Sequence, residues 1–324
     1  MRGQAVDAVD QRIDLAVHPL DQIVQRRHGL PSVRDEVVEG HDLHGKNIIV
    51  TGANTGIGYE TARALASIGG VVTLACRNTS AAEQACQKIR QQHPTASVNA
   101  MLLDLSDLNS VRQFAQEYEQ DSISLLINNA GSSAPSLMTT TQGFERTVGV
   151  CHIGHFLLTQ LLLPKLMAAQ SPRVIMLSSE SHRYPARLDF ENLGKAQGSY
   201  KSMRAYGQAK LCNVLMADEL QRRYGDQGLT ACSVHPGALV STDFGRESRL
   251  FRAAFWLASP FTKNPNQGAA TTVYCALHEP ASEIAGGYFS HCKRARQTAE
   301  AKDPQVAAQL WSLSEQWVAE YMGT

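Results

Sequence analysis

Three closely spaced glycines lie between an apolar run and a helical pattern near residue 50. The apolar run is Asn47–Thr51, and the following Ile57–Ile68 places its small and apolar side chains on one helical face. Glycines let the chain turn tightly and bring backbone N–H groups against a phosphate at the positive end of a helix. A glycine-rich turn without a ligand is the alternative, but a strand before it and a helix after it favour a dinucleotide-binding turn. The binding residues expected here are Gly52, Asn54, Thr55, Gly56, Ile57 and Gly58.

Short apolar runs alternate with helical patterns, such as Ser80–Gln92, along the rest of the chain. This alternation predicts an α/β fold, a doubly wound parallel sheet of the Rossmann type with helices on both faces. Ligands then bind beyond the carboxyl ends of the strands. We expect residues 45–324 to form this single domain, with strands at Asn47–Thr51, Val71–Ala75, Val98–Leu103, Ser124–Ile127, Val174–Leu177, Thr230–Val234 and Tyr288–Phe289.

Two segments do not follow the alternation. Residues 1–44 precede the first strand and are expected to form an N-terminal tail or arm. Residues 183–202 form a long insertion between the fifth strand and the next helix, and contain Pro185, Gly194 and Gly198. A connection of that length is expected to act as a lid.

The composition favours a globular protein whose partner is a small molecule. Hydrophobic residues make up 43% of the chain, and 30 basic residues balance 30 acidic ones. With these equal numbers the chain has no excess of basic residues, whereas proteins that bind nucleic acid or acidic membranes usually have one. The longest apolar run, Phe156–Ala169, is interrupted by polar residues and a proline. We therefore expect no nucleic-acid partner and no membrane span.

The cysteines and histidines do not form a metal-binding pattern. The seven cysteines are scattered without a C-x-x-C pair, and are expected to be reduced thiols in a cytoplasmic protein. His152 and His155 have no carboxylate or thiolate cluster at matching spacing. We expect no metal, and we interpret both histidines as packed helix residues.

The end of the second strand, Ala75–Asn78, lacks the carboxylate that NAD sites usually place there. Arg77 instead offers a guanidinium suited to the 2′-phosphate of NADP(H). A solvated loop charge is the alternative for Arg77. After the third strand, Asp104 and Leu105 are placed to meet the adenine edge, although Asp104 is also suited to cap the next helix.

Tyr206 and Lys210 are four residues apart, so on a helix they share one face. A neighbouring ammonium stabilises phenolate and lowers the pKa of a phenol, which makes Tyr206 a general acid/base. Lys210 is also suited to hold the nicotinamide ribose. The pattern Y-x-x-x-K occurs by chance on many helix surfaces; its position after the fifth strand of a nucleotide-binding sheet gives it meaning.

Two serines, Ser178 and Ser179, end the fifth predicted strand. A hydroxyl there is placed to hydrogen-bond the substrate oxygen and to stabilise charge as hydride is transferred. We expect Ser179 to be the catalytic one; a turn-forming role is the alternative.

In this order, with Asn128–Gly131 after the fourth strand and Pro236–Gly237 after the sixth, the motifs resemble the classical short-chain dehydrogenases/reductases over nearly all of residues 45–320. Ala75–Asn78, His152–Phe156 and Ser178–Arg183 look like retinol dehydrogenases, and most like the catalytic domain of WW-domain-containing oxidoreductases. The tail has no tryptophan, so no WW module is expected. The resemblance implies NADP(H) preference at Arg77 and cofactor contacts from Asn129, Ala130, Gly131, Pro236, Gly237 and Ser241.

Cys151 departs from the family pattern, which has Asn at this position. In the family, that Asn helps to hold a water that links the lysine to bulk solvent. A thiol is a weak hydrogen-bonding substitute, although the water is bound largely through a backbone carbonyl. Cys151 is therefore expected to slow the proton relay without abolishing it.

Residues 242–263 contain a bulky apolar stretch, Leu250–Leu257, beside the expected nicotinamide site. They are expected to form a wall for a hydrophobic primary or secondary alcohol or its carbonyl; a subunit interface or ordinary core is the alternative. The sequence predicts an NADP(H)-dependent oxidoreductase. A nucleotide-binding regulatory or scaffold protein with impaired catalysis is the second hypothesis. By analogy with the family, we expect a homodimer or homotetramer.

Overall fold

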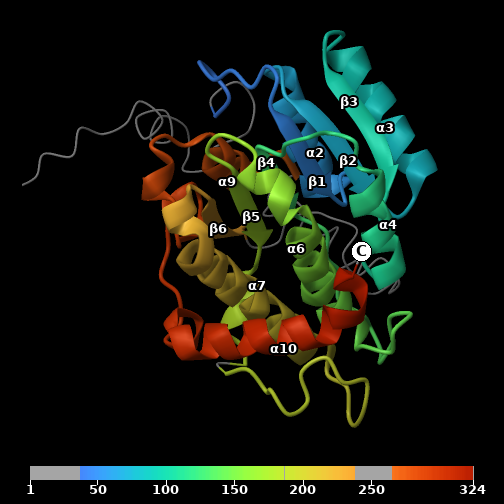
Figure 1. Cartoon of the computed structure of the whole chain (residues 1–324), viewed down its shortest axis with the longest axis vertical. Helices are drawn as coiled ribbons and strands as arrows, with labels where there is room; N and C mark the ends of the chain where they lie inside the picture. Colours follow the sequence, from blue (N-terminus) through green and yellow to red (C-terminus); the bar gives the residue numbers. More distant parts are fainter. Residues whose placement is uncertain (1–36, 186, 238–264, 324) are drawn as a thin grey trace, which may run out of the picture.

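The computed structural model describes residues 37–185, 187–237 and 265–323 (Figure 1). Within them, eight strands form one sheet in the order β3-β2-β1-β4-β5-β6-β7-β8. Neighbouring strands from β3 to β7 are parallel, and only β8 is antiparallel to its neighbour. The strands are β1 (Asn47–Thr51), β2 (Val71–Cys76), β3 (Ser97–Leu102), β4 (Leu125–Asn128), β5 (Arg173–Leu177), β6 (Thr230–His235), β7 (Tyr288–Ser290) and β8 (Lys293–Arg294).

The α/β Rossmann-type prediction is confirmed, and the seven predicted strands are present with ends that differ by at most one residue. The central strands were recognisable because both of their faces are covered. Every residue of β4, β5 and β6 is buried, and β4 and β5 are nearly continuous apolar runs. The two-residue β8 was not predicted, because its exposed Lys293 and Arg294 carry no strand pattern.

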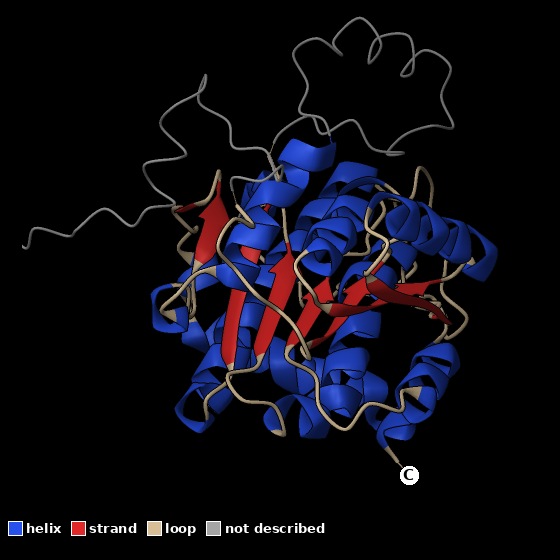
Figure 2. Ribbon diagram, turned by 90° about the horizontal axis from the view of Figure 1, so that it is seen from above, coloured by secondary structure: helices blue, strands red, loops and turns tan. Residues whose placement is uncertain are grey.

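Helices cover both faces of the sheet, as the view from above shows (Figure 2). On one face, α2 (Gly56–Ser67), α3 (Thr79–Gln92) and α9 (Pro265–Leu277) bury small apolar side chains against the strands. On the other face lie α4 (Leu108–Glu117), the short α5 (Arg146–Val148), α6 (Gly154–Met167) and α7 (Ser202–Tyr224). Short 3₁₀ turns occur at Glu180–Arg183, Gly225–Gln227, Ala281–Glu283 and Glu300–Lys302.

Polar side chains mark where several helices begin. Asn78 accepts a hydrogen bond from the Ala81 N–H and caps α3. Asp107 accepts one from the Asn109 N–H and caps α4, so the alternative role of Asp104 as the cap of this helix is wrong. Asp303 caps the last helix, α10 (Pro304–Met322), whose first residue is a proline.

Helix α10 lies across the outer side of α6 and α7 (Figure 1). Its buried Trp311 packs edge-to-face on Phe156, with ring centroids 5.0 Å apart, and the Arg223 guanidinium stacks over the indole. The Ser314 hydroxyl lies 2.8 Å from Nε2 of His152. The C-terminal helix therefore completes the core on this side.

A π-helical turn, Gly149–Ile153, joins α5 to α6 and makes one continuous helical stretch. Among the described residues, only Arg146–Met167 is long and apolar enough to cross a membrane, and 72% of its most apolar window is buried inside the protein. Its position between the sheet and α10 accounts for that apolar character.

The segments outside the predicted alternation have different environments. Of the predicted tail, residues 37–44 are described, and they pack on the domain: Val37 is buried, and the Leu43 N–H donates to the Ile68 carbonyl. The described part of the insertion 183–202 packs beside α5 and the start of α7, where it borders a cavity of about 260 Å³. Residues 242–263 and Ser241 lie outside the described residues.

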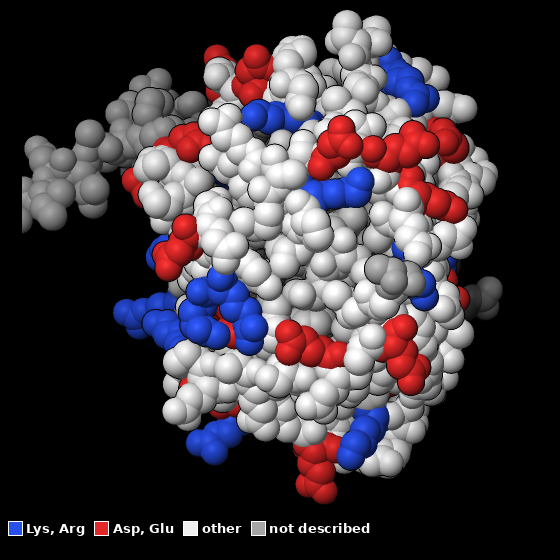
Figure 3. Space-filling model, in the orientation of Figure 1, with Lys and Arg blue, Asp and Glu red and all other residues white. Residues whose placement is uncertain are grey.

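Acidic and basic side chains are interspersed on the face that carries α10 (Figure 3), in keeping with 30 residues of each sign. Oppositely charged side chains also pair within α7, where Arg222 and Arg223 both bind the carboxylate of Glu219. This face therefore presents no broad field of one sign.

Candidate active site

A groove follows the carboxyl ends of the central strands. One half is a cavity of about 300 Å³ that contains the predicted catalytic pair. The other half, about 220 Å³, lies beyond β2 and β3. The two cavities share four lining residues, Gly52, Ala130, Gly131 and Ser132, so they form one continuous site.

The glycine turn after β1 forms the floor of the groove. Gly52 and Gly56 have positive φ angles of 64° and 61°, which other residues rarely adopt. A Cβ on Gly58 would lie 2.4 Å from the Gly52 carbonyl oxygen. Thr55, at the N-cap of α2, makes no side-chain hydrogen bond to the helix. The first N–H groups of α2 are thus left without a side-chain acceptor, as in a turn that receives a phosphate.

Arg77, Asp104 and Leu105 line the half of the groove beyond β2 and β3. Arg77 is exposed at its rim, and Asn78 is occupied as the cap of α3. One carboxylate oxygen of Asp104 accepts hydrogen bonds from the Ser106 N–H and hydroxyl. Arg77 and Asp104 therefore share the cavity that sequence analysis assigned to the adenosine.

Tyr206 and Lys210 lie one turn apart on α7 and line the other half of the groove. The Lys210 Nζ is 5.5 Å from the centroid of the Tyr206 ring and donates to the Leu177 carbonyl at 2.9 Å. Burial raises the pKa of Tyr206, while Lys210 and a hydrogen bond with Ser179 lower it only in part. Lys210 lowers the pKa of Tyr206, as expected, but burial raises it by more. The phenol therefore keeps its proton at neutral pH.

The structure separates the roles of the two serines that follow β5. The Ser178 hydroxyl is buried and donates to the Lys210 carbonyl at 2.7 Å, which ties β5 to α7. Ser179 instead caps the 3₁₀ turn Glu180–Arg183 and hydrogen-bonds Tyr206. Ser179 is therefore the serine that meets the Tyr206 phenol.

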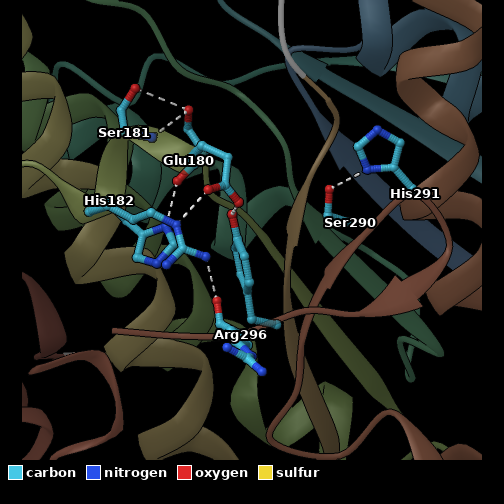
Figure 4. A network of polar contacts seen from close by, with 9 residues as sticks. Glu180, Ser181, His182, Ser290, His291 and Arg296 are labelled. Atoms are coloured by element: carbon cyan, nitrogen blue, oxygen red, sulfur yellow. Dashed lines mark hydrogen bonds and ion pairs between the residues drawn. The ribbon is translucent and has the colours of Figure 1, made fainter. Parts of the chain in front are cut away.

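The 3₁₀ turn after Ser179 is held by contacts to β7 and the segment after β8 (Figure 4). Glu180 accepts a hydrogen bond from the Tyr288 hydroxyl and pairs with Arg183. Arg183 also donates to the Arg296 carbonyl, and the ring of the buried His182 lies 2.7 Å from the Ser179 carbonyl. Ser179 thus begins a turn whose position depends on distant strands.

Gly207, beside Tyr206, allows this turn to approach α7 closely. A Cβ on Gly207 would lie 1.6 Å from the Tyr184 carbonyl oxygen and 2.7 Å from that of Ser181. Only a glycine fits this position without moving the turn. Nothing in the local sequence indicates this requirement, because the contact joins two separate segments of the chain.

Cys151 lies within the π-helical turn, fully buried beside Lys210. A Cβ on Gly131 would be 3.2 Å from both the Cys151 Sγ and the Lys210 Nζ. Burial raises the pKa of the Cys151 thiol, and the nearby Lys210 lowers it in part. The sulfur is therefore a neutral thiol that contacts the active site without forming part of the groove lining.

His152 and His155 are fully buried, as expected of packed helix residues. Within the described residues, no group of three or more His, Cys, Asp or Glu side chains could hold a metal ion. All seven cysteines are free and buried.

Most of the predicted cofactor residues come together in the groove. Gly237 follows the lining residue Pro236 but does not itself line the groove, and Ser241 lies outside the described residues. Nine further described residues that were not predicted as site residues also line it: Ala75, Cys76, Asn78, Leu103, Ser132, Arg146, Val150, Leu177 and Ser178. The one available signal was periodicity, since Arg146 and Val150 are one helical turn apart.

Comparisons with known proteins show the family of this chain. The family model for short chain dehydrogenases matches residues 46–190. WW domain-containing oxidoreductase of Gallus gallus is 41% identical over 325 residues, covering 97% of this chain and 78% of that protein. Retinol dehydrogenase 12 of Mus musculus is 43% identical over 274 residues, covering 84% of this chain and 86% of that protein.

Solved structures share the fold. An uncharacterized protein from Mycobacterium paratuberculosis has a TM-score of 0.71 at 34% identity and covers 87% of this chain and 97% of its own. A short chain dehydrogenase from Escherichia coli CFT073, complexed with NADPH, has a TM-score of 0.61 at 22% identity and covers 77% of this chain and 97% of its own, a likeness of fold alone. The chain therefore belongs to the short-chain dehydrogenase/reductase family of oxidoreductases, which use a nicotinamide cofactor.

Proposed function

We propose that this protein is an NADP(H)-dependent oxidoreductase that interconverts a hydrophobic alcohol and its carbonyl compound, with Tyr206 as the general acid/base. The observation that carries the proposal is the convergence of Tyr206 and Lys210 at the cavity floored by the glycine turn, with Ser179 hydrogen-bonded to the Tyr206 phenol. Retinol dehydrogenase 12, by its name, acts on a hydrophobic alcohol, which supports this substrate class.

The residues of the groove fit a dinucleotide. The positive φ angles at Gly52 and Gly56 and the uncapped start of α2 form a cradle for a pyrophosphate. Arg77, with no carboxylate beside it in β2, favours the 2′-phosphate of NADP(H). Asp104 and Leu105 would hold the adenine, and Asn129 and Lys210 the ribose beside the nicotinamide. The bound cofactor supplies or accepts the hydride.

The chain's own residues supply the proton and the charge stabilisation. In reduction, the Tyr206 O–H gives its proton to the carbonyl oxygen of the substrate while the Ser179 hydroxyl donates a hydrogen bond to the same oxygen. The Lys210 ammonium stabilises the phenolate that remains. Because burial keeps the pKa of Tyr206 above its usual value, the proton is present on the phenol at neutral pH.

Replacing Tyr206 by Phe tests the proposal. Tyr206→Phe should lower the rate of NADPH oxidation with an apolar carbonyl substrate by about a thousandfold, the range of general acid catalysis. The dissociation constant for NADPH should change little, because the phenol is not needed to hold the phosphates. Tyr184→Phe, which alters a 66% exposed tyrosine nearby, is the matched control. Unchanged turnover in Tyr206→Phe would refute the proposed role.

The second candidate, a nucleotide-binding scaffold with impaired catalysis, rests on Cys151 at the position where the family has Asn. Cys151→Asn separates the two functions. A large gain in turnover supports an enzyme whose proton relay is slowed by the thiol. If neither form oxidises NADPH with a panel of apolar carbonyls although both bind it, the scaffold function is the correct one.

The proposals on assembly and location follow from packing and thiol chemistry. Pairing through α6 and α7 would require displacement of α10, so a homodimer or homotetramer would use another surface. Light scattering of the wild-type protein measures the oligomeric state.

The seven free, buried cysteines support a reducing compartment such as the cytoplasm, which cell fractionation would examine.

A further inference from the structure

The strands that carry the cofactor groove and the helix that carries Cys151 are joined by one buried imidazole. Nε2 of His155 lies 2.9 Å from the Thr51 hydroxyl at the end of β1, and Nδ1 lies 3.0 Å from the Cys151 carbonyl oxygen. His155 is fully buried at the start of α6. It thus connects two segments that are 100 residues apart in the chain.

The partners of His155 fix which nitrogen carries the proton. A carbonyl oxygen only accepts, so Nδ1 must donate to Cys151. Burial lowers the pKa of His155 to about 4, so the ring is neutral at physiological pH and Nε2 must accept. The Thr51 hydroxyl then donates to Nε2. Its alternative acceptor, the Ile127 carbonyl, is farther away at 3.4 Å.

The Thr51 hydroxyl oxygen in turn holds the loop that follows β4. It accepts hydrogen bonds from the backbone N–H groups of Asn129 and Ala130, both at 2.9 Å. Both residues line the groove, next to Gly131. One hydroxyl, oriented by His155, therefore satisfies two backbone donors of the cofactor loop.

At its other nitrogen, His155 holds the π-helical turn Gly149–Ile153. The carbonyl that it binds belongs to Cys151, whose thiol faces the same point beside Gly131 as the Lys210 ammonium. The loop after β4 and the turn that contains Cys151 approach each other at this point. Their relative position decides what surrounds Lys210.

We propose that His155 is a positioning residue that holds the cofactor loop Asn129–Gly131 and the Cys151 turn in register beside Lys210. Its Nε2 contacts the Thr51 hydroxyl, which holds the cofactor loop. Its Nδ1 contacts the Cys151 carbonyl oxygen, which belongs to the π-helical turn. The inference rests on the proposed function in one respect: it assigns cofactor binding to the loop Asn129–Gly131 and the proton relay to the Cys151 turn.

Two substitutions of His155 each remove one of its two hydrogen bonds and keep the other. In His155→Asn, the side-chain amide nitrogen takes the place of Nδ1 and keeps the bond to Cys151, whereas the bond to Thr51 is lost. In His155→Gln, the amide oxygen reaches the place of Nε2 and keeps the bond to Thr51, whereas the bond to Cys151 is lost. His152→Asn and His152→Gln are the matched controls, because His152 is equally buried on the same helical stretch but binds Ser314 of α10.

We expect a crossed result. His155→Asn should raise the dissociation constant for NADPH about fivefold with kcat within about twofold, as for the loss of one hydrogen bond. His155→Gln should lower kcat about fivefold with NADPH affinity within about twofold. The His152 variants should lower the midpoint of thermal unfolding and leave both constants within about twofold. The proposal is overturned if the His155 variants behave like the His152 variants.

A second pair of variants tests the Thr51 part of the link if the His155 variants do not fold. Thr51→Ser retains the hydroxyl, and Thr51→Val removes it at nearly the same volume. Thr51→Val alone should weaken NADPH binding; equal affinities in the two variants would contradict the link. NADPH titration does not depend on turnover, so it tests His155 even if the wild-type protein reduces no carbonyl, in which case the proposed function fails by itself.

Discussion

The two halves of the groove are built in different ways. In the half beyond β2, Arg77 is exposed and projects from a contiguous strand-end motif, so its environment is mostly solvent. In the half that contains Tyr206, Lys210 is buried, Tyr206 and Ser179 are half-buried, and other segments hold two of them: the Leu177 carbonyl holds Lys210, and a turn anchored on β7 holds Ser179. We infer that the first half can be damaged only by changes within it, whereas the second half is sensitive to substitutions that never touch a ligand.

The largest effect that would sharpen this contrast is expected at Gly207. Gly207→Ala would place a Cβ 1.6 Å from the Tyr184 carbonyl oxygen, which forces the turn that begins at Ser179 to move. We expect kcat to fall by about a hundredfold, the order of effect for a misplaced reacting group, with NADPH affinity nearly unchanged. Gly323→Ala, where a Cβ would meet nothing within 4 Å, is the control. Normal turnover in Gly207→Ala would break the contrast.

Gly58, in the glycine turn that forms the cofactor cradle, should show the opposite pattern: a loss of NADPH affinity rather than of kcat. A Cβ on Gly58 would lie 2.4 Å from the Gly52 carbonyl oxygen and 2.5 Å from the Asn129 amide nitrogen. We expect Gly58→Ala to weaken NADPH binding by about thirtyfold, since the cradle must open, and to leave kcat at saturation closer to that of the wild type. Calorimetric titration and steady-state rates check both values. A fall in kcat without a change in affinity would remove the distinction between the halves.

A smaller and more selective effect is expected at Arg77. Arg77→Ala should lower the preference for NADPH over NADH by about tenfold, the order expected for one charge-assisted contact to phosphate. The affinity for NADH should change by less than about twofold, because the exposed guanidinium supports no other part of the groove. Dissociation constants for both cofactors, measured before and after the substitution, test this. If their ratio does not move, Arg77 is only a surface charge.

The smallest effect is expected at Asp218, on α7 but away from both halves. Burial raises the pKa of Asp218 from 3.8 to about 7, so the folded protein holds this proton more tightly than the unfolded chain. Stability linked to this group should therefore decrease as the pH rises from about 4 to about 7, and then stay level. Asp218→Asn should raise the unfolding midpoint by about 3 °C at pH 8 and by less at pH 5. Equal gains at both pH values would contradict the linkage, and kcat should not change at either.

Much of the fold and the cofactor half could be predicted because the signals are contiguous. The buried strands are apolar runs, and the glycines of the turn after β1 stand together with their strand and helix. The catalytic half was predicted as a set of residues, but not as an arrangement. Neither the contact of Gly207 with Tyr184 nor the bonds of His155 leaves a mark in the local sequence.

The sequence by itself determined the local chemistry: a Tyr and a Lys on one helical face, a serine at a strand end, and an arginine where a carboxylate is usual. The tertiary structure alone decided that Ser178 ties β5 to α7 while Ser179 meets Tyr206, and that Asp107 rather than Asp104 caps α4. It also decided that burial outweighs Lys210 in the pKa of Tyr206. The physical reason is that spacing along the chain fixes which side chains share a face, whereas burial and hydrogen-bond partners depend on distant segments that meet only when the chain folds.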